Sequence, residues 1–153
     1  MIKKALIIGY GNPLRSDDGV GQAAARALAH EAAVDGAEVI GCHQLMPELA
    51  EGLAAVDLAV FVDAAAGLEP GDVVVKPVQS AAGPSAGLIH HVAPGALLAL
   101  SEKLYGRSPE AFLVTVGAGS LALGEGLSEV VAAALPRVIA AVRQLVLAHL
   151  PHA

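Results

Sequence analysis

Two adjacent aspartates, Asp17 and Asp18, stand in the glycine-rich stretch GYGNPLRSDDGVG at residues 9–21, between an apolar run and a segment with helical spacing. A glycine-rich turn before a helix usually holds a phosphate group. Two carboxylates at that place would repel a phosphate, and the stretch lacks the third glycine and the later acidic residue of a dinucleotide-binding motif. The pair instead predicts a turn that presents a carboxylate to a cation, or one that caps the following helix.

Further ionisable side chains that could bind a cation or transfer a proton stand at or just after other apolar or glycine-rich segments: Asp63, His43, His90 and His91. Each also has a purely structural interpretation. Asp63 could cap the loop that follows it by accepting hydrogen bonds from the amides of Ala65 or Ala66, and a loop histidine can simply be solvated. Two carboxylates and an imidazole that converge from three segments would form a ligand set typical of a divalent transition ion with open positions for water or substrate.

The pattern of apolar runs predicts the elements that must position these residues. Short apolar runs predict five strands at residues 4–9, 37–41, 57–63, 72–78 and 111–117. Helical spacing predicts helices at residues 20–31, 47–54, 93–105 and 126–150, the last kinked or restarted at Pro136. This alternation predicts the α/β class: a three-layer αβα sandwich with a mostly parallel five-stranded sheet. Ligands of such sheets bind at the carboxyl ends of the strands, where the ionisable residues would meet.

The stretch 9–21 also predicts local geometry. Gly9 and Gly11 are expected to let the chain turn tightly off the first strand, and Asn12 to fix that turn through side-chain bonds to the backbone. Pro77 places the strand 72–78 at an edge of the sheet, because proline cannot donate to a central ladder.

The two aspartates are expected to divide their roles. Ser16 is in a position to cap the helix 20–31, and acidic residues suit the positive end of a helix. Neighbouring residues at a helix start point in different directions. Asp17 is therefore expected to serve the start of this helix, and Asp18 to face the ligand.

The composition limits the class of protein. The 153 residues are expected to form a single domain (1–153), and 55% of them are hydrophobic but only 3% aromatic. The sequence has no apolar stretch of about 18 residues free of Pro and Arg, and the run after Lys3 and Lys4 is too short for a signal peptide. The single cysteine, Cys42, excludes an internal disulfide and suits the cytoplasm. A net charge of −6 without a basic block argues against nucleic acid as a partner, and no membrane association is expected.

Four motifs in order carry a resemblance to a known family. The stretch 9–21 resembles the N-terminal signature of the [NiFe]-hydrogenase maturation endopeptidases. FVDA at 61–64 resembles the family's second acidic motif, HVAP at 91–94 its histidine motif, and LxxGxGLS at 121–128 the segment before its last helix. The similarity extends over nearly the whole chain.

The resemblance implies a fold and an activity. Members have an αβα fold with a five-stranded sheet and remove a short C-terminal extension from the hydrogenase large subunit after nickel insertion, recognising the bound nickel. The family's metal ligands correspond to Asp18, Asp63 and His91, with Asp18 and Asp63 as the catalytic carboxylates of an aspartic-type, nickel-dependent peptidase. His91 is chosen over His90 because the family's histidine stands three residues before the residue that opens the next helix, here Pro94.

Two segments depart from the common family pattern. The segment CHQLMPELA at 42–50 replaces a motif linked to substrate choice, and it resembles the branch that serves bidirectional, NAD(P)-coupled hydrogenases. His43, Gln44 and His90 are therefore expected to contribute to substrate recognition. After the fifth strand, GAGS stands where many members have Glu-Pro or Gln-Pro near the position of Gly119.

The resemblance also implies the partners. The expected partner is the large-subunit precursor, and the expected metal is nickel supplied by that substrate, which another divalent ion could replace in a crystal. The ion could polarise the scissile carbonyl, activate water, or only position the bond while a carboxylate acts as general base. The protein is expected to act as a monomer.

Other functions compete with this interpretation. A nickel-dependent maturation chaperone that does not cleave its client would use the same ligands, and a peptidyl-tRNA hydrolase-like enzyme would have a similar layout. The acidic net charge argues against the peptidyl-tRNA hydrolase-like enzyme, which would have to bind RNA. A nucleophilic pair of Cys42 and His43 is disfavoured because adjacent residues of a strand face opposite sides.

Overall fold

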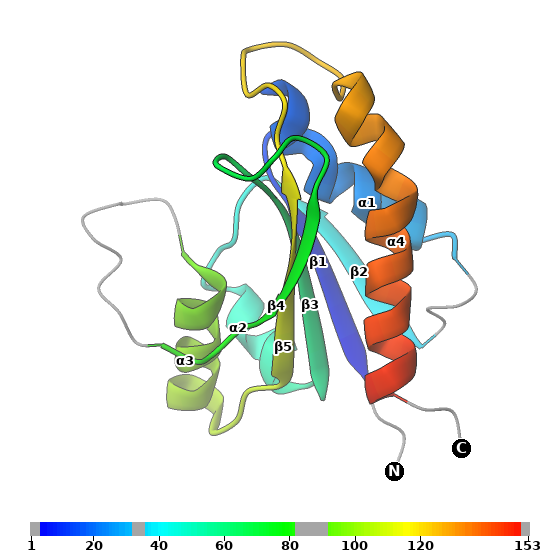
Figure 1. Ribbon diagram of the computed structural model, residues 1–153. Coiled ribbons are helices and arrows are strands. Elements are labelled where there is room, and N and C mark those ends of the chain that lie inside the picture. Colours follow the sequence, from blue (N-terminus) through cyan, green and yellow to red (C-terminus); the bar gives the residue numbers. More distant parts are fainter. Residues whose placement is uncertain (1–3, 32–35, 82–91, 151–153) are drawn as a thin grey trace.

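The computed structural model describes residues 4–31, 36–81 and 92–150. Within these ranges, strands and helices alternate along most of the chain, and a short 3-10 turn, η1, precedes the first helix (Figure 1). The elements are β1 (Ala5–Tyr10), η1 (Ser16–Gly19), α1 (Val20–Leu28), β2 (Ala37–Cys42), α2 (Leu49–Ala54), β3 (Leu58–Ala65), β4 (Val73–Pro77), α3 (Pro94–Tyr105), β5 (Glu110–Gly117) and α4 (Glu129–His149).

The strands form one five-stranded sheet in the order β2-β1-β3-β5-β4. The first four strands of this order run parallel, and β4 pairs antiparallel with β5 at one edge. Pro77 lies in this edge strand, as its missing N–H requires. The predicted α/β class with a mostly parallel sheet is confirmed.

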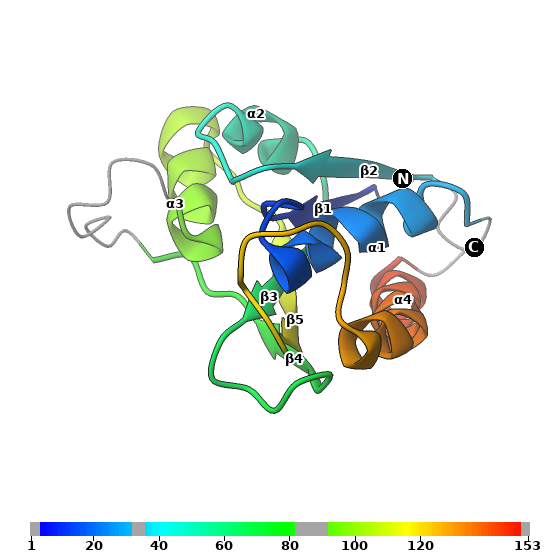
Figure 2. The same ribbon diagram turned by 90° about the horizontal axis from the view of Figure 1, so that it is seen from above.

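Helices cover both faces of the sheet. Figure 2, viewed from above, shows α1 and α4 on one face and α2 and α3 on the other. Alternate side chains of β1 enter the two cores: Ala5 and Ile7 pack with α1 and α4, while Leu6 and Ile8 pack with α2 and α3. The same alternation in β3 puts Phe61 on the α2/α3 face. Tyr10 and Asp63, two residues beyond Ile8 and Phe61, therefore lie on that face too.

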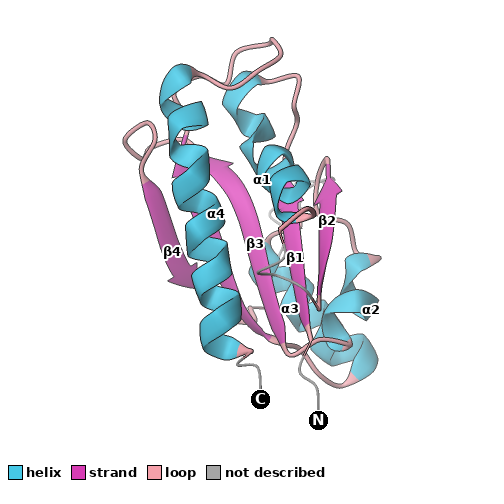
Figure 3. Cartoon of the chain, turned by 90° about the vertical axis from the view of Figure 1, so that its right-hand side faces the viewer, coloured by secondary structure: helices cyan, strands magenta, loops and turns pink. Residues whose placement is uncertain are grey.

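The last helix is continuous. Of the two predicted alternatives at Pro136, a kink or a restart, the restart is wrong, because α4 runs unbroken from Glu129 to His149 with Pro136 inside it (Figure 3). Pro136 and Ala132 are both exposed, so the Ala132 carbonyl, which loses its N–H partner to the proline, can be solvated instead.

One face of α4 is buried against the sheet. Its buried residues recur at three- and four-residue spacing: Val131, Ala134, Val138, Val142 and Val146. In the described part of the chain, α4 is the one helix whose length and composition would suffice to cross a membrane. Its buried stripe belongs to the core between α1, α4 and the sheet, and 28% of its apolar window is buried.

Two glycines bring β1 and α1 into direct contact. A Cβ atom on Gly9 would lie 1.9 Å from the carbonyl oxygen of Gly21, and one on Gly21 would lie 2.4 Å from the carbonyl oxygen of Tyr10. Gly9 is thus required inside the strand for the close approach of the helix, rather than for a turn after the strand. The backbone of the following loop turns at Gly11, which has φ 144°.

We expect Gly21→Ala to destabilise the protein by at least about 2 kcal/mol, because its methyl group would overlap backbone atoms that cannot move independently. Gly52 in α2 provides the matched control, since a Cβ there meets only Leu6 Cδ2 at 3.6 Å. Gly52→Ala should stabilise the protein by roughly 0.5–1 kcal/mol through helix propensity. Urea denaturation of both variants measures the difference, and equal effects would contradict the close packing.

Candidate active site

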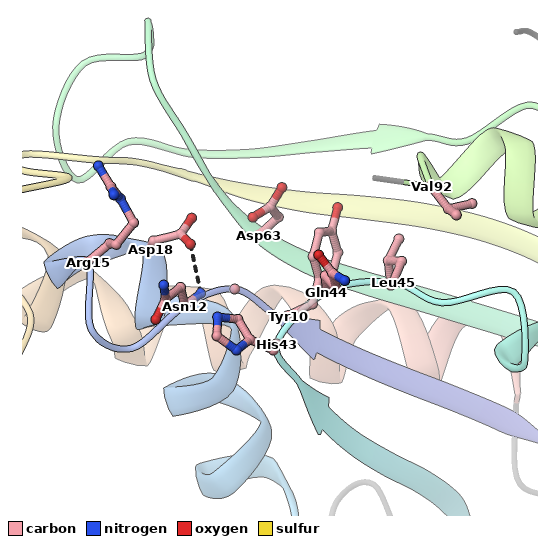
Figure 4. A pocket seen from close by; sticks show the side chains of 10 residues that line it. Tyr10, Asn12, Arg15, Asp18, His43, Gln44, Leu45, Asp63 and Val92 are labelled. Atoms are coloured by element: carbon pink, nitrogen blue, oxygen red, sulfur yellow. Dashed lines mark hydrogen bonds between the residues drawn. The ribbon is translucent and has the colours of Figure 1, made fainter. Parts of the chain in front are cut away.

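A pocket of about 300 Å3 opens at the carboxyl ends of β1, β2 and β3 (Figure 4). The end of β1 and the turn after it, the segment after β2, the end of β3 and the segment before α3 contribute to its lining. The lining residues are Tyr10, Gly11, Asn12, Arg15, Asp18, His43, Gln44, Leu45, Asp63 and Val92. The pocket thus lies where ligands of open α/β sheets bind.

Asp18 reaches the pocket from η1 and is held by the loop before it. Its Oδ2 accepts a hydrogen bond of 2.7 Å from the backbone N–H of Asn12. The Asn12 side chain accepts one of 2.9 Å from the backbone N–H of Leu14, and Gln22 Nε2 donates to the Gly11 carbonyl at 2.8 Å. The side-chain bond of Asn12 fixes the turn in the way that its position in the sequence suggests.

Asp63 lies on the same pocket from the end of β3. Burial raises the pKa of this carboxyl to about 6, and the charge of Asp18 also raises it. Hydrogen bonds from Tyr10 and from the backbone of Ala64 act in the opposite direction. Burial raises the pKa of Tyr10 far above its usual value, so its hydroxyl is neutral and donates to Asp63. Asp63 is therefore a partly desolvated carboxylate, not a simple cap on the loop that follows.

The structure brings part of the predicted set together. Figure 4 shows the carboxylates of Asp18 and Asp63 directed into a shared space, with His43 and Gln44 on the wall formed after β2. His90 and His91 lie outside the described residues, so the third predicted ligand is not placed. Among residues 4–31, 36–81 and 92–150, no cluster of three or more His, Cys, Asp or Glu side chains is arranged to hold a metal ion.

Tyr10 and Arg15 are pocket residues that the sequence analysis missed. Alternation along β1 could have revealed Tyr10, because it places this phenol on the face of Leu6 and Ile8. Arg15 had no such signal, since it lies in an irregular turn. It adds one cation at the rim of a pocket that otherwise carries two carboxylates.

Cys42 is half-buried at the end of β2, and burial raises the pKa of its thiol. A raised pKa lowers the thiolate population that a nucleophile needs. Cys42 is not among the residues that line the pocket, whereas His43 is. This geometry is consistent with the rejection of a Cys42–His43 pair on grounds of strand alternation.

The role predicted for Asp17 is wrong. Among the residues that the structure describes, no side chain caps η1 or α1. The Asp17 carboxylate is buried and accepts hydrogen bonds from the loop between β5 and α4, including one of 2.7 Å from the backbone N–H of Ser128. Ser128 is the N-cap residue of α4, so Asp17 places its charge at the start of the last helix instead of the first.

The prediction that Ser16 caps the first helix is also wrong. Its hydroxyl donates to the carbonyl of Ala122 at 2.8 Å, across to the same loop. Ser16 has φ 51°, a left-handed conformation that turns its side chain away from the helix start.

No protein-family model matches this chain, and no curated protein matches it in sequence. Solved structures do match. The [NiFe] hydrogenase maturation protease HybD from Thermococcus kodakarensis is 27% identical, with a TM-score of 0.72 over 93% of this chain and 98% of that one. HycI from the same organism is 23% identical, with a TM-score of 0.75 over 94% of this chain and 92% of that one. The maturating endopeptidase HybD from E. coli is 23% identical, with a TM-score of 0.73 over 94% of this chain and 91% of that one. The resemblance indicated by the motifs is therefore confirmed, and the chain has the fold of these proteases.

The raised pKa of Asp63 predicts a pH-dependent loss of stability. The folded protein binds this proton more tightly than the unfolded chain, whose pKa is near the usual 3.8. The contribution of Asp63 to stability is therefore fully present below about pH 4 and is lost as the pH rises through about 6, at up to about 1.4 kcal/mol per pH unit. Asp63→Asn removes this titration, so wild type should lose stability relative to the variant across that range.

Thermal melts of metal-free wild type and Asp63→Asn between pH 4 and pH 7 measure this difference. Groups that do not interact with Asp63 titrate alike in both proteins and cancel in the comparison, whereas Asp18, which is coupled to Asp63, titrates as part of the same change. A difference that stays constant with pH would show that Asp63 is not shifted.

Proposed function

We propose that this chain, which has the fold of the [NiFe] hydrogenase maturation proteases, is an endopeptidase that removes the C-terminal extension of a hydrogenase large-subunit precursor after nickel has been inserted. The observation that carries the proposal is the convergence of Asp18 and Asp63 in one pocket at the carboxyl ends of the strands. The similarity of both the sequence motifs and the fold to the maturation proteases supplies the reaction class.

The nickel belongs to the substrate in this proposal. Carboxylate oxygens are suitable ligands for a divalent transition ion, and the pocket presents two carboxylates. At neutral pH, Asp63 is mostly ionised because its pKa is about 6. A bound cation would favour the ionised form further. His91 remains the proposed third ligand.

The pocket supports direct attack by water. Its lining contains no Ser, Thr or Cys in the described part of the chain, so an acyl-enzyme intermediate has no evident nucleophile there. Water adds to the scissile carbonyl carbon, the C–N bond breaks, and the proton removed from water passes to the departing amine. The Asp63 carboxylate would accept that proton from water and pass it on as the general base. Tyr10 keeps this carboxylate oriented by its hydrogen bond.

The remaining assignments follow from the same proposal. His43 and Gln44 line the pocket wall and would contact the precursor next to the cleavage site. Together with His90, they would contribute to the choice of hydrogenase, in the branch that serves bidirectional NAD(P)-coupled enzymes. We propose that the protein acts in the cytoplasm as a monomer.

The test uses purified protein with nickel-loaded and nickel-free precursor, and mass spectrometry of the products. We expect the loss of the C-terminal peptide only from the nickel-loaded precursor. Binding without a change in precursor mass would indicate a non-cleaving chaperone. Binding of tRNA instead of the precursor would indicate a peptidyl-tRNA hydrolase-like enzyme.

We expect Asp18→Asn and Asp63→Asn to abolish cleavage while the fold survives, because each keeps the size of the side chain and removes its charge. Asp57→Asn is the matched control, since Asp57 stands just before β3 at its opposite end and pairs there with Arg107 at 3.4 Å. The control should retain cleavage. Normal cleavage by either pocket variant would contradict the assignment of that carboxylate.

A further inference from the structure

We infer that Asp17 is the positioning residue for Asp18: its buried carboxylate ties η1 to the loop at residues 118–128, between β5 and α4, and thereby holds Asp18 in the pocket. This inference rests on the proposed function and deepens it. In this inference Asp17 supports the reaction by positioning Asp18 and does not itself contact the substrate.

The carboxylate of Asp17 is enclosed by donors. Its Oδ2 accepts hydrogen bonds of 2.8 Å from the backbone N–H groups of Gly119 and Ser120 and from the hydroxyl of Ser128. Its Oδ1 accepts one of 2.7 Å from the backbone N–H of Ser128. Asp17 is 0% exposed. Burial alone would raise its pKa, but the hydrogen bonds from Ser128, Ser120 and Gly119 outweigh burial and lower it, so the group stays ionised.

Backbone bonds extend the same contact. The N–H of Asp17 donates to the Ser120 carbonyl at 3.0 Å, and that of Ser16 to the Gly124 carbonyl at 2.9 Å. The N–H of Gly124 donates back to the Leu14 carbonyl at 2.9 Å. Figure 1 shows the loop after β5 passing beside the segment before α1 at this end of the sheet. The turn and the loop therefore form one hydrogen-bonded unit.

Asp17 and Asp18 are consecutive residues of a single four-residue turn and face opposite ways. Asp17 points into the protein toward Gly119 and Ser128, and Asp18 points into the pocket, where Asn12 donates to it at 2.7 Å. A shift of η1 that follows loss of the Asp17 contacts must move Asp18. A misplacement of about 1 Å in a catalytic group can cost about 100-fold in rate.

The charge of Asp17 is essential to this contact. Four donors converge on its two oxygens, and a carboxylate is acceptor-only. In Asp17→Asn, an NH2 group would face one or more of these donors. Ser128→Ala is milder, because it removes only the hydroxyl bond and keeps the backbone N–H.

The Asn12 amide reports the position of Asp18 without any assay of activity. The hydrogen bonds of the Asp17 carboxylate go to residues 119–128, whereas the Asn12 amide donates to Asp18. A role of Asp17 confined to its own contacts would therefore leave this amide unchanged in the folded protein. We expect Asp17→Asn to change its NMR chemical shift and to speed its hydrogen exchange, and Ser128→Ala to do so less strongly. With nickel-loaded precursor, kcat of Asp17→Asn should fall about 100-fold while KM stays within about twofold.

Ser101→Ala is the control for stability. It removes a buried hydrogen bond of 2.7 Å to the Ala50 carbonyl, between α3 and α2 and away from the pocket. It should leave the Asn12 amide and kcat unchanged. If folded Asp17→Asn keeps the wild-type amide signal and kcat, or if Ser101→Ala loses kcat equally, the inference is overturned. If Asp17→Asn does not fold, Ser128→Ala decides by the same two readouts.

The amide readout also separates this inference from the proposed function. Wild-type protein that leaves the nickel-loaded precursor intact would refute the proposed function. The effect of Asp17→Asn on the Asn12 amide would still show whether Asp17 positions Asp18.

Discussion

The direct contact between β1 and α1 determines what lies at the carboxyl end of the sheet. Gly9 and Gly21 leave no room for a side chain between strand and helix, with a Cβ on Gly9 only 1.9 Å from the Gly21 carbonyl oxygen. The helix must therefore start close above the strand end, and the connecting residues fold back into η1. A Cβ on Gly11 would likewise lie 1.9 Å from the carbonyl oxygen of Asp18. This close backbone contact brings the acidic turn to the pocket.

Three aspartates near this turn have different properties because their surroundings differ. Asp17 is the most deeply buried, yet four donors stabilise its charge and lower its pKa. Asp63 is partly buried with fewer donors, so desolvation prevails and raises its pKa to about 6. Asp18 is less buried than Asp17 and contacts one backbone amide in the pocket. The charge of Asp17 is thus used up by hydrogen bonds inside the protein, whereas Asp18 and Asp63 have fewer donors and can bind a ligand.

The contact between Asp17 and the loop after β5 depends little on the side chains of that loop. Three of its four donors are backbone N–H groups, those of Gly119, Ser120 and Ser128. Backbone donors are present in any sequence except at proline. The loop can therefore depart from the pattern common among the maturation proteases and still bind the carboxylate. The fold is similarly retained in the solved proteases at 23–27% identity.

The sequence by itself determined the elements, the sheet class and the motifs that identify the acidic residues. Hydrophobic periodicity is a local property, so the strands were predicted within a few residues, and Pro77 correctly marked the edge strand. The tertiary structure alone decided what each polar group contacts. Sequence reasoning assigned Asp17 to the adjacent helix because local capping is the only partner visible along the chain. Its actual partners lie 102 to 111 residues away, and they became neighbours only when β5 paired with β3 and α4 packed beside α1. Pro136 is a second example: the local rule for proline left a kink or a restart open, and α4, whose buried stripe packs against the core, is continuous through this residue.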